Sequence, residues 1–116
     1  MKQTIIHIRH KRTFNDIKYG LKQIEGRLYK GRFKDIFPGQ ILTLYHDHTS
    51  VYIEVTKISI YPTLYDMLSD SDIRSKCLPH IDNTCDSIHY YNQFYNTKTI
   101  NKKLAMAIHF KLCKQL

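Results

Sequence analysis

The stretch from Gly20 to Arg27 holds the side chains of this chain that are best suited to chemistry. Lys22, Glu25 and Arg27 lie close together, and the last two are two residues apart, so on a β-strand they share a face. The planar fork of the guanidinium can bind a polar ligand, while the carboxylate can accept hydrogen bonds from the edge of a base. The lysine could donate a proton, or accept one if burial or neighbours lowered its pKa. In the alternative interpretation, these side chains form a structural ion pair.

Basic residues are interleaved with aromatic ones directly after this stretch. Aromatic faces can stack on unpaired bases while lysines meet phosphates, so the run is typical of a surface that binds nucleic acid. The residues that we expect on this surface are Tyr29, Lys30, Arg32 and Lys34, together with Arg9, Lys11 and Arg12 nearer the N-terminus. In the alternative interpretation, Phe33 and Phe37 are core residues and the charges form a solvated loop. Tyr91 and Tyr95 could place a hydroxyl group near the site, although aromatic residues at this spacing more often anchor a helix.

The positive charge is concentrated in the first third of the chain. The formal net charge is +8, and residues 1–40 hold ten Lys or Arg against three Asp or Glu, which leaves +1 for the other 76 residues. A local positive field attracts polyanions, most often nucleic acid, because phosphates are neutralised and counterions are released. A basic surface without any partner is the alternative.

A metal site receives less support from the sequence. Cys77, His80, Cys85 and His89 are residue types that bind zinc, but four residues separate the two pairs, much less than the usual intervening loop. No Ser-His-Asp arrangement, phosphate-binding glycine loop or dinucleotide fingerprint is present. We therefore expect neither a metal nor a cofactor.

The chain lacks a run of about 18 apolar residues, so we expect no membrane span and no membrane partner. Residues 1–8 form a strand pattern and a poor signal peptide. Three cysteines without a signal peptide favour reduced thiols and an intracellular protein, either cytoplasmic or nuclear.

Five strands are expected to position the site residues. The alternation of apolar residues predicts strands over residues 4–8, 23–29, 40–45, 51–61 and 104–112. Gly26 falls among the inward-facing residues of the second strand, so another group is expected to pack closely against it. Residues 46–50 form a polar hairpin connection.

Helices are expected between the strands. Thr13 is a candidate cap for a helix over residues 14–19, and Thr63 with Asp66 forms a capping box for a helix that carries Leu64, Met67 and Leu68. A further helix carries Ile88, Tyr91 and Tyr95. A polar, mildly acidic stretch with a break at Pro79 lies between the last two of these helices, and residues 98–103 are expected to be a basic polar connection. We predict one domain, residues 1–116, of the α+β class: a partly closed barrel with short helices covering its ends, whose last strand lies beside an early one.

The sequence resembles the ASCH family, whose GxKxxExR motif is reproduced by Gly20, Lys22, Glu25 and Arg27. The likeness continues through IHIRHKRTFNDIKYG before the motif and RLYKGRFKDIFPGQILTLY after it. The later segments ISIYPTLYDML, CLPHID, YYNQFY and AMAIHF are similar to landmarks of the short single-domain members. The resemblance covers nearly the whole chain.

This resemblance implies a barrel related to the PUA domains, with the motif lining a cleft suited to RNA or a nucleotide. Some bacterial relatives are amidohydrolases that remove an acyl group from a modified cytidine, and ribonuclease activity is associated with others. The acyl-removing relatives have a nucleophilic threonine where this chain has Glu25, and glutamate is a poor replacement for a hydroxyl nucleophile. Lys22 and Arg27 match the motif.

Three functions follow, in order of preference. The first is a module that binds RNA or a nucleotide through Lys22, Glu25, Arg27 and the basic residues around them. The second is a hydrolase acting on modified nucleosides or RNA, in which Lys22 and Glu25 would be catalytic. The third is a protein-interaction adaptor that uses the acidic helical region, residues 63–90, as its docking face.

Overall fold

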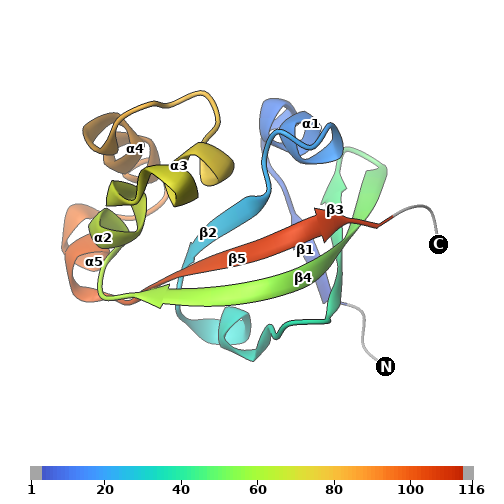
Figure 1. The fold of residues 1–116 in the computed structure, drawn as a ribbon, viewed down its shortest axis with the longest axis horizontal. Coiled ribbons are helices and arrows are strands. Elements are labelled where there is room, and N and C mark those ends of the chain that lie inside the picture. Colours follow the sequence, from blue (N-terminus) through green and yellow to red (C-terminus); the bar gives the residue numbers. More distant parts are fainter. Residues whose placement is uncertain (1–3, 114–116) are drawn as a thin grey trace.

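The computed structural model describes residues 4–113, which form a five-stranded sheet curled into a half-barrel with short helices beside it (Figure 1). The expected α+β class with a barrel-like sheet is confirmed. The strands are β1 (Thr4–His7), β2 (Ile24–Leu28), β3 (Ile41–His46), β4 (Thr49–Tyr61) and β5 (Ala105–Leu112). The helices are α1 (Lys11–Lys18), the 3₁₀ helix η1 (Gly31–Asp35), α2 (Leu64–Ser69), α3 (Ser71–Cys77), α4 (Thr84–Tyr91) and α5 (Thr97–Lys102).

The order of the strands leaves the sheet open between β1 and β2. The order is β1-β3-β4-β5-β2, with β1 and β3 parallel and the other neighbours antiparallel. The last strand lies beside β2, an early strand, as the sequence predicted. β1 and β2 are therefore the two edges of the sheet, and no ladder joins them within residues 4–113.

The curl of the sheet depends on β4. The first half of this long strand pairs with β3 and the second half pairs with β5. The register shifts between Val55 and Lys57, which is the position of a β-bulge. A bulge bends the strand and increases its twist, so the two halves of β4 belong to different parts of the curved sheet.

Two cores lie on opposite sides of β5. Met106, Ile108 and Phe110 face the inside of the half-barrel, whereas Ala105 and Ala107 face the helices. This division follows the alternation that the sequence predicted for the last strand. The inner core also contains Ile6, Ile8, Phe14, Ile17, Leu42, Leu44, Ile53 and Val55. The outer core contains Ile24, Leu64, Met67, Leu68, Ile73, Cys77, Tyr91 and Ile100, and α2–α5 form a helical lobe over it (Figure 1).

The predicted capping box of α2 is confirmed, but the predicted start of α1 is wrong. Thr63 Oγ1 accepts a hydrogen bond from the backbone N–H of Asp66, at 3.1 Å. Helix α1 instead begins at Lys11, after His10, whose side chain makes no capping hydrogen bond. The side chain of Asp16, within this helix, is buried.

Helix α5 occupies a segment that was predicted to be a connection, whereas α3 lies within the acidic region, residues 63–90, that was expected to be helical. The side chain of Asp70 caps α3 and that of Asn96 caps α5, while Ile73 and Ile100 bury one face of each helix. Helices this short gain most of their stability from tertiary packing, which explains why their local pattern is weak. Helix α4 ends at Tyr91, so Tyr95 lies beyond it. Within residues 4–113, no helix has the length and apolar character needed to cross a membrane.

Candidate functional site

A cleft of about 770 Å³ lies along the gap between β1 and β2. Its walls come from the end of β1, from β2, from α1 and from the helical lobe, so the helices convert the open seam of the half-barrel into a groove that is open to solvent on one side. A volume of this size is ordinary for sites that bind a small molecule or a nucleotide. The motif residues Lys22, Glu25, Gly26 and Arg27 all line it.

Lys22 is buried beneath the cleft, and its ammonium group has a partner for each of its protons. Only 4 % of the residue is exposed, and its Nζ donates to the carbonyl oxygens of Ile24 at 2.7 Å and Cys77 at 2.5 Å. The same nitrogen lies 3.3 Å from Oε1 of Glu25. An ammonium group has three protons, so these partners use all of them. Lys22 therefore positions Glu25 and the Cys77 backbone rather than offering a free donor to a ligand.

Electrostatics keep this lysine charged. Burial acts to lower the pKa of Lys22, but the Cys77 side chain and the Glu25 carboxylate together outweigh burial and raise the pKa above its ordinary value. The group is consequently an ammonium ion at neutral pH. A lysine in this state cannot act as a general base.

Glu25 orients Arg27. Its Oε2 accepts a hydrogen bond from Nε of Arg27 at 2.8 Å and forms an ion pair with Nη2 of the same guanidinium, also at 2.8 Å. Burial acts to raise the pKa of Glu25, but Arg27 and Lys22 outweigh it and lower the pKa, so the carboxylate stays ionised at neutral pH. The three side chains therefore form a continuous chain of charges, with Glu25 between the two cations.

Arg27 brings this chain of charges to the cleft surface. Its side chain is 25 % exposed, and its Cζ lies 4.8 Å from the centre of the Phe33 ring. Within residues 4–113, Nη1 of Arg27 makes no hydrogen bond, so the outer edge of the guanidinium is available to a ligand. Carbonyl, carboxylate and phosphate oxygens fit that edge.

Gly26 allows the helical lobe to pack closely against β2. A Cβ atom at this position would lie 2.6 Å from the hydroxyl of Tyr91 and 2.8 Å from Cε of Met67. The close approach predicted from the sequence is confirmed. The Tyr91 hydroxyl donates to the Gly26 carbonyl at 3.3 Å and lies 3.3 Å from Sγ of Cys77. Burial, with Cys77 and Glu25 nearby, raises the pKa of Tyr91 well above its ordinary value, so this hydroxyl remains neutral.

Positive charge dominates the cleft. Six of its described lining residues are Lys or Arg and two are acidic, which gives a net charge of +4 with histidines neutral. Both acidic groups already have partners: Glu25 is bound as above, and the two carboxylate oxygens of Asp16 lie 3.0 and 2.9 Å from Nε2 of His80. The cations are Arg9, Arg12, Lys22, Arg27, Lys30 and Arg32.

Only some of the aromatic and basic residues that follow the motif line the cleft. Lys30, Arg32 and Phe33 line the cleft, whereas Tyr29 packs against the inner core and Lys34 lies over the Tyr29 ring, 5.5 Å from its centre. The division occurs because β2 ends at Leu28 and η1 follows, so strand alternation does not continue. Lys11 is exposed on α1 and does not line the cleft. The alternative that placed Phe37 in the core is wrong, because this side chain is 56 % exposed.

An aromatic wall on the helical lobe was predicted only in part, because the sequence singled out Tyr95 but not Tyr90 or Phe94. All three side chains line the cleft, and the rings of Tyr90 and Phe94 meet edge to face with centres 5.4 Å apart. The cluster YYNQFY contained the signal, since Tyr90 and Phe94 are four residues apart. Tyr91, which the sequence also singled out, lines the cleft and in addition anchors α4 in the outer core.

The cysteine and histidine pairs weighed as a zinc site are not brought together. Cys77 is buried beside Lys22 and Tyr91, Cys85 is exposed, and His80 contacts Asp16. Within residues 4–113, no three His, Cys, Asp or Glu side chains are placed to hold a metal ion.

Two solved structures share this fold over nearly the whole chain. The crystal structure of a hypothetical protein from Pyrococcus, PH0355, is 26 % identical in sequence, with a TM-score of 0.84 over 97 % of this chain and 100 % of that protein. The solution structure of protein PF0455 from Pyrococcus furiosus is 22 % identical, with a TM-score of 0.74 over 98 % of this chain and 100 % of that protein. No family model and no curated protein sequence matches the chain. The fold is therefore shared with proteins whose names state no function.

Proposed function

We propose that this protein is an ASCH-type domain of the PUA-like class that binds single-stranded RNA, or a nucleotide of it, in the cleft between β1 and β2. The observation that carries the proposal is the guanidinium of Arg27, held by Glu25 with one edge free, in a cleft of net charge +4. A planar donor fork at the base of a positive groove suits a base edge or a phosphate oxygen.

The cations support attraction of a polyanion. Lys22 and Arg27 lie at the motif, and the remaining four basic residues lie on the exposed part of the cleft wall. Binding that neutralises phosphates releases counterions, so the affinity should fall steeply as the salt concentration rises.

The aromatic wall supports recognition of unpaired bases. Tyr90, Phe94 and Tyr95 lie in the same cleft as Arg27, and Phe94 is 38 % exposed. A base can stack on an exposed ring while its edge meets the guanidinium. A double helix would not offer its base faces in this way.

The charge states favour binding over acid–base catalysis. Lys22 is held as an ammonium ion, Glu25 as a carboxylate and Tyr91 as a neutral hydroxyl. None of these groups has a pKa moved toward neutrality, which is the usual adjustment for a general acid or base. The hydrolase alternative is accordingly less well supported than the binding module.

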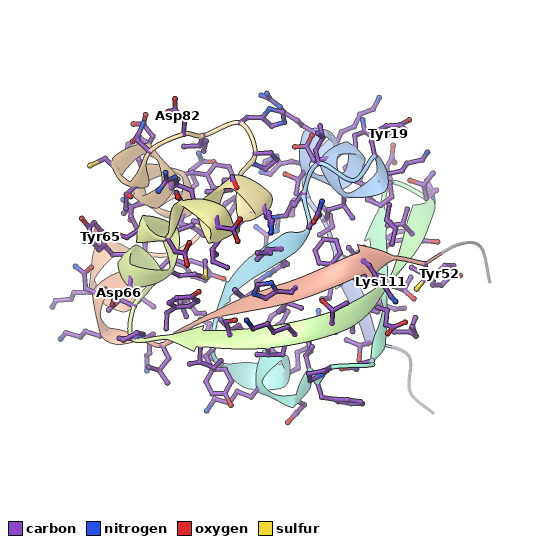
Figure 2. The ribbon with its side chains drawn as sticks, viewed as in Figure 1. Tyr19, Tyr52, Tyr65, Asp66, Asp82 and Lys111 are labelled. Atoms are coloured by element: carbon purple, nitrogen blue, oxygen red, sulfur yellow. The ribbon has the colours of Figure 1, made fainter. Side chains whose placement is uncertain are left out.

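A fluorescence anisotropy titration with short single-stranded RNA tests this function. We expect wild-type binding to weaken with salt, and Arg27→Ala to lower the affinity by about tenfold or more, since a good bidentate contact contributes roughly 1–3 kcal/mol. Arg27→Lys keeps the charge but loses the fork, so it should not restore binding. Lys111→Ala is the matched control, because Lys111 lies at the C-terminal end of β5 (Figure 2) and does not line the cleft. The proposal would be overturned if the wild-type affinity for RNA did not change with salt concentration, or if Arg27→Ala and Lys111→Ala bound RNA equally well.

A further inference from the structure

We infer that the cleft binds an internal segment of a single strand that runs along β2, with phosphates held at both ends of the cleft, rather than a free mononucleotide. This inference rests on the proposed function and specifies its ligand. It comes from the placement of the two exposed cation pairs, Arg9 with Arg12 and Lys30 with Arg32, relative to the motif.

The two pairs follow the ends of two strands that run in opposite directions. β1 is parallel to β3, and three antiparallel steps lead from β3 through β4 and β5 to β2. Arg9 and Arg12 lie just after the C-terminal end of β1, and Lys30 and Arg32 lie just after that of β2. Because the strands are antiparallel in direction, the pairs lie toward opposite ends of the cleft.

The ribbon shows the same arrangement. Helix α1, which contains Arg12, lies at the start of β2, and the 3₁₀ helix that contains Arg32 lies at its other end (Figure 1). β2 itself spans five residues, Ile24–Leu28. Its four steps of ~3.3 Å cover roughly 13 Å, so the length of this strand separates the chain segments that carry the two cation pairs.

All four side chains remain available for phosphates. Within residues 4–113, none of the four forms a salt bridge with a carboxylate, and the two acidic groups of the cleft are engaged elsewhere. Lys30 lies 5.6 Å from the centre of the Tyr95 ring, and Arg32 lies 5.4 Å from that of Phe33. Aromatic contacts of this kind limit the positions of the cations without neutralising them.

The motif lies between the two pairs. Arg27 belongs to β2 itself and presents its free guanidinium edge to the cleft. A mononucleotide carries its phosphate at one end, so it can satisfy only one pair while its base reaches Arg27. An internal nucleotide has a phosphate on each side of its base, so a strand can satisfy both pairs and Arg27 together. The positions of the cations therefore fit a nucleic-acid strand better than a mononucleotide.

Titrations of two ligand types against paired variants test this inference. The ligands are nucleoside 5′-monophosphates and a length series of single-stranded RNAs from the dinucleotide upward. The variants are Arg9→Ala/Arg12→Ala and Lys30→Ala/Arg32→Ala, and the control with the same charge change is Lys98→Ala/Lys111→Ala, both exposed and outside the cleft. The glutamine versions of both cleft pairs provide a second measurement if an alanine variant is unstable.

We expect affinity to rise with RNA length until both pairs are engaged. Each cleft double variant should reduce the slope of log affinity against log salt by about 1.4 for RNA, since each phosphate contact on a single strand contributes roughly 0.7. The monophosphates should lose affinity in one double variant at most. The control double variant should keep most of the wild-type slope.

The outcomes separate this inference from the proposed function. If a monophosphate binds as tightly as the longest RNA, or if one cleft pair carries the whole change in slope, the strand inference is wrong while Arg27-dependent binding stands. If the wild type binds neither ligand type, the proposed function fails and the inference fails with it.

Discussion

The ammonium of Lys22 donates to the backbone carbonyl of Cys77, a residue 55 positions away in the sequence, at 2.5 Å. This hydrogen bond joins the turn after α1 to the end of α3, across the outer core. The same nitrogen contacts Glu25, which in turn holds Arg27. One buried cation thus connects the helical lobe to the ligand-facing edge of β2, and the stability of the fold is coupled to the geometry of the candidate site.

Replacing Lys22 with methionine should destabilise the fold strongly. The variant keeps a long side chain but leaves the Ile24 and Cys77 carbonyls without their donor and removes one of the two cations that compensate Glu25. Breaking a buried ion pair from one side costs about 3–5 kcal/mol in the free energy of unfolding. Urea denaturation followed by circular dichroism measures this loss. Lys111→Met, at an exposed lysine, is the control, and a Lys22→Met cost as small as that of the control would contradict the role assigned to Lys22.

Glu25 should make the free energy of unfolding depend on pH in the acidic range. Although burial opposes it, the neighbouring Arg27 and Lys22 hold the folded-state pKa below the ordinary 4.5. A carboxyl group of this kind contributes stability above its unfolded pKa, and the contribution is lost as the pH falls through the folded value. The free energy of unfolding should therefore drop below about pH 4.5.

The variant Glu25→Gln isolates this contribution. Its loss of stability relative to the wild type should be largest near neutral pH and should shrink as the pH is lowered, because the wild-type carboxylate becomes protonated. Chemical denaturation at a series of pH values between about 7 and 3 records both curves. Glu54→Gln, at a more exposed carboxylate 4.0 Å from Lys111, is the matched control. Parallel curves for the wild type and Glu25→Gln would disprove the assignment.

Gly26→Ala should destabilise the fold through overpacking. The added Cβ would lie 2.6 Å from the Tyr91 hydroxyl, and an extra methyl in a tightly packed site typically costs about 1–3 kcal/mol. The Tyr91→Phe variant removes the nearest of the clashing atoms, so the alanine should cost less in that background. A double-mutant cycle of unfolding free energies measures the difference. Equal costs in both backgrounds would show that the hydroxyl does not set the space available at position 26.

Phe94→Ala should weaken RNA binding with little loss of stability. Phe94 is 38 % exposed and lines the cleft, and stacking of a base on an aromatic side chain contributes roughly 1–3 kcal/mol. We expect affinity for single-stranded RNA to fall by at least fivefold, which corresponds to about 1 kcal/mol at room temperature. Phe37→Ala is the control, because Phe37 is exposed outside the cleft. If the two variants bind RNA equally well, the aromatic wall does not contact bases.

Local patterns in the sequence predicted most of the sheet and part of the helical structure. The alternation in the last strand predicted which side chains face each core, because a strand turns successive residues to opposite sides. Thr63 and Asp66 predicted the start of α2 through a contact between near neighbours. Gly26 signalled a close approach, although its partners Tyr91 and Met67 could not be identified from sequence.

The sequence by itself determined the chemistry present in the motif and the strands that hold it, since both depend on residues a few positions apart. The tertiary structure decided that Lys22 is buried while Arg27 reaches the cleft, that Phe94 lines the cleft while Tyr29 packs against the inner core, and that α5 is a helix. Each of these outcomes depends on groups brought together from distant parts of the chain, such as Lys22 and Cys77. Spacing along a sequence fixes local geometry, but burial is set by what the curled sheet and the helical lobe place on either side of a residue.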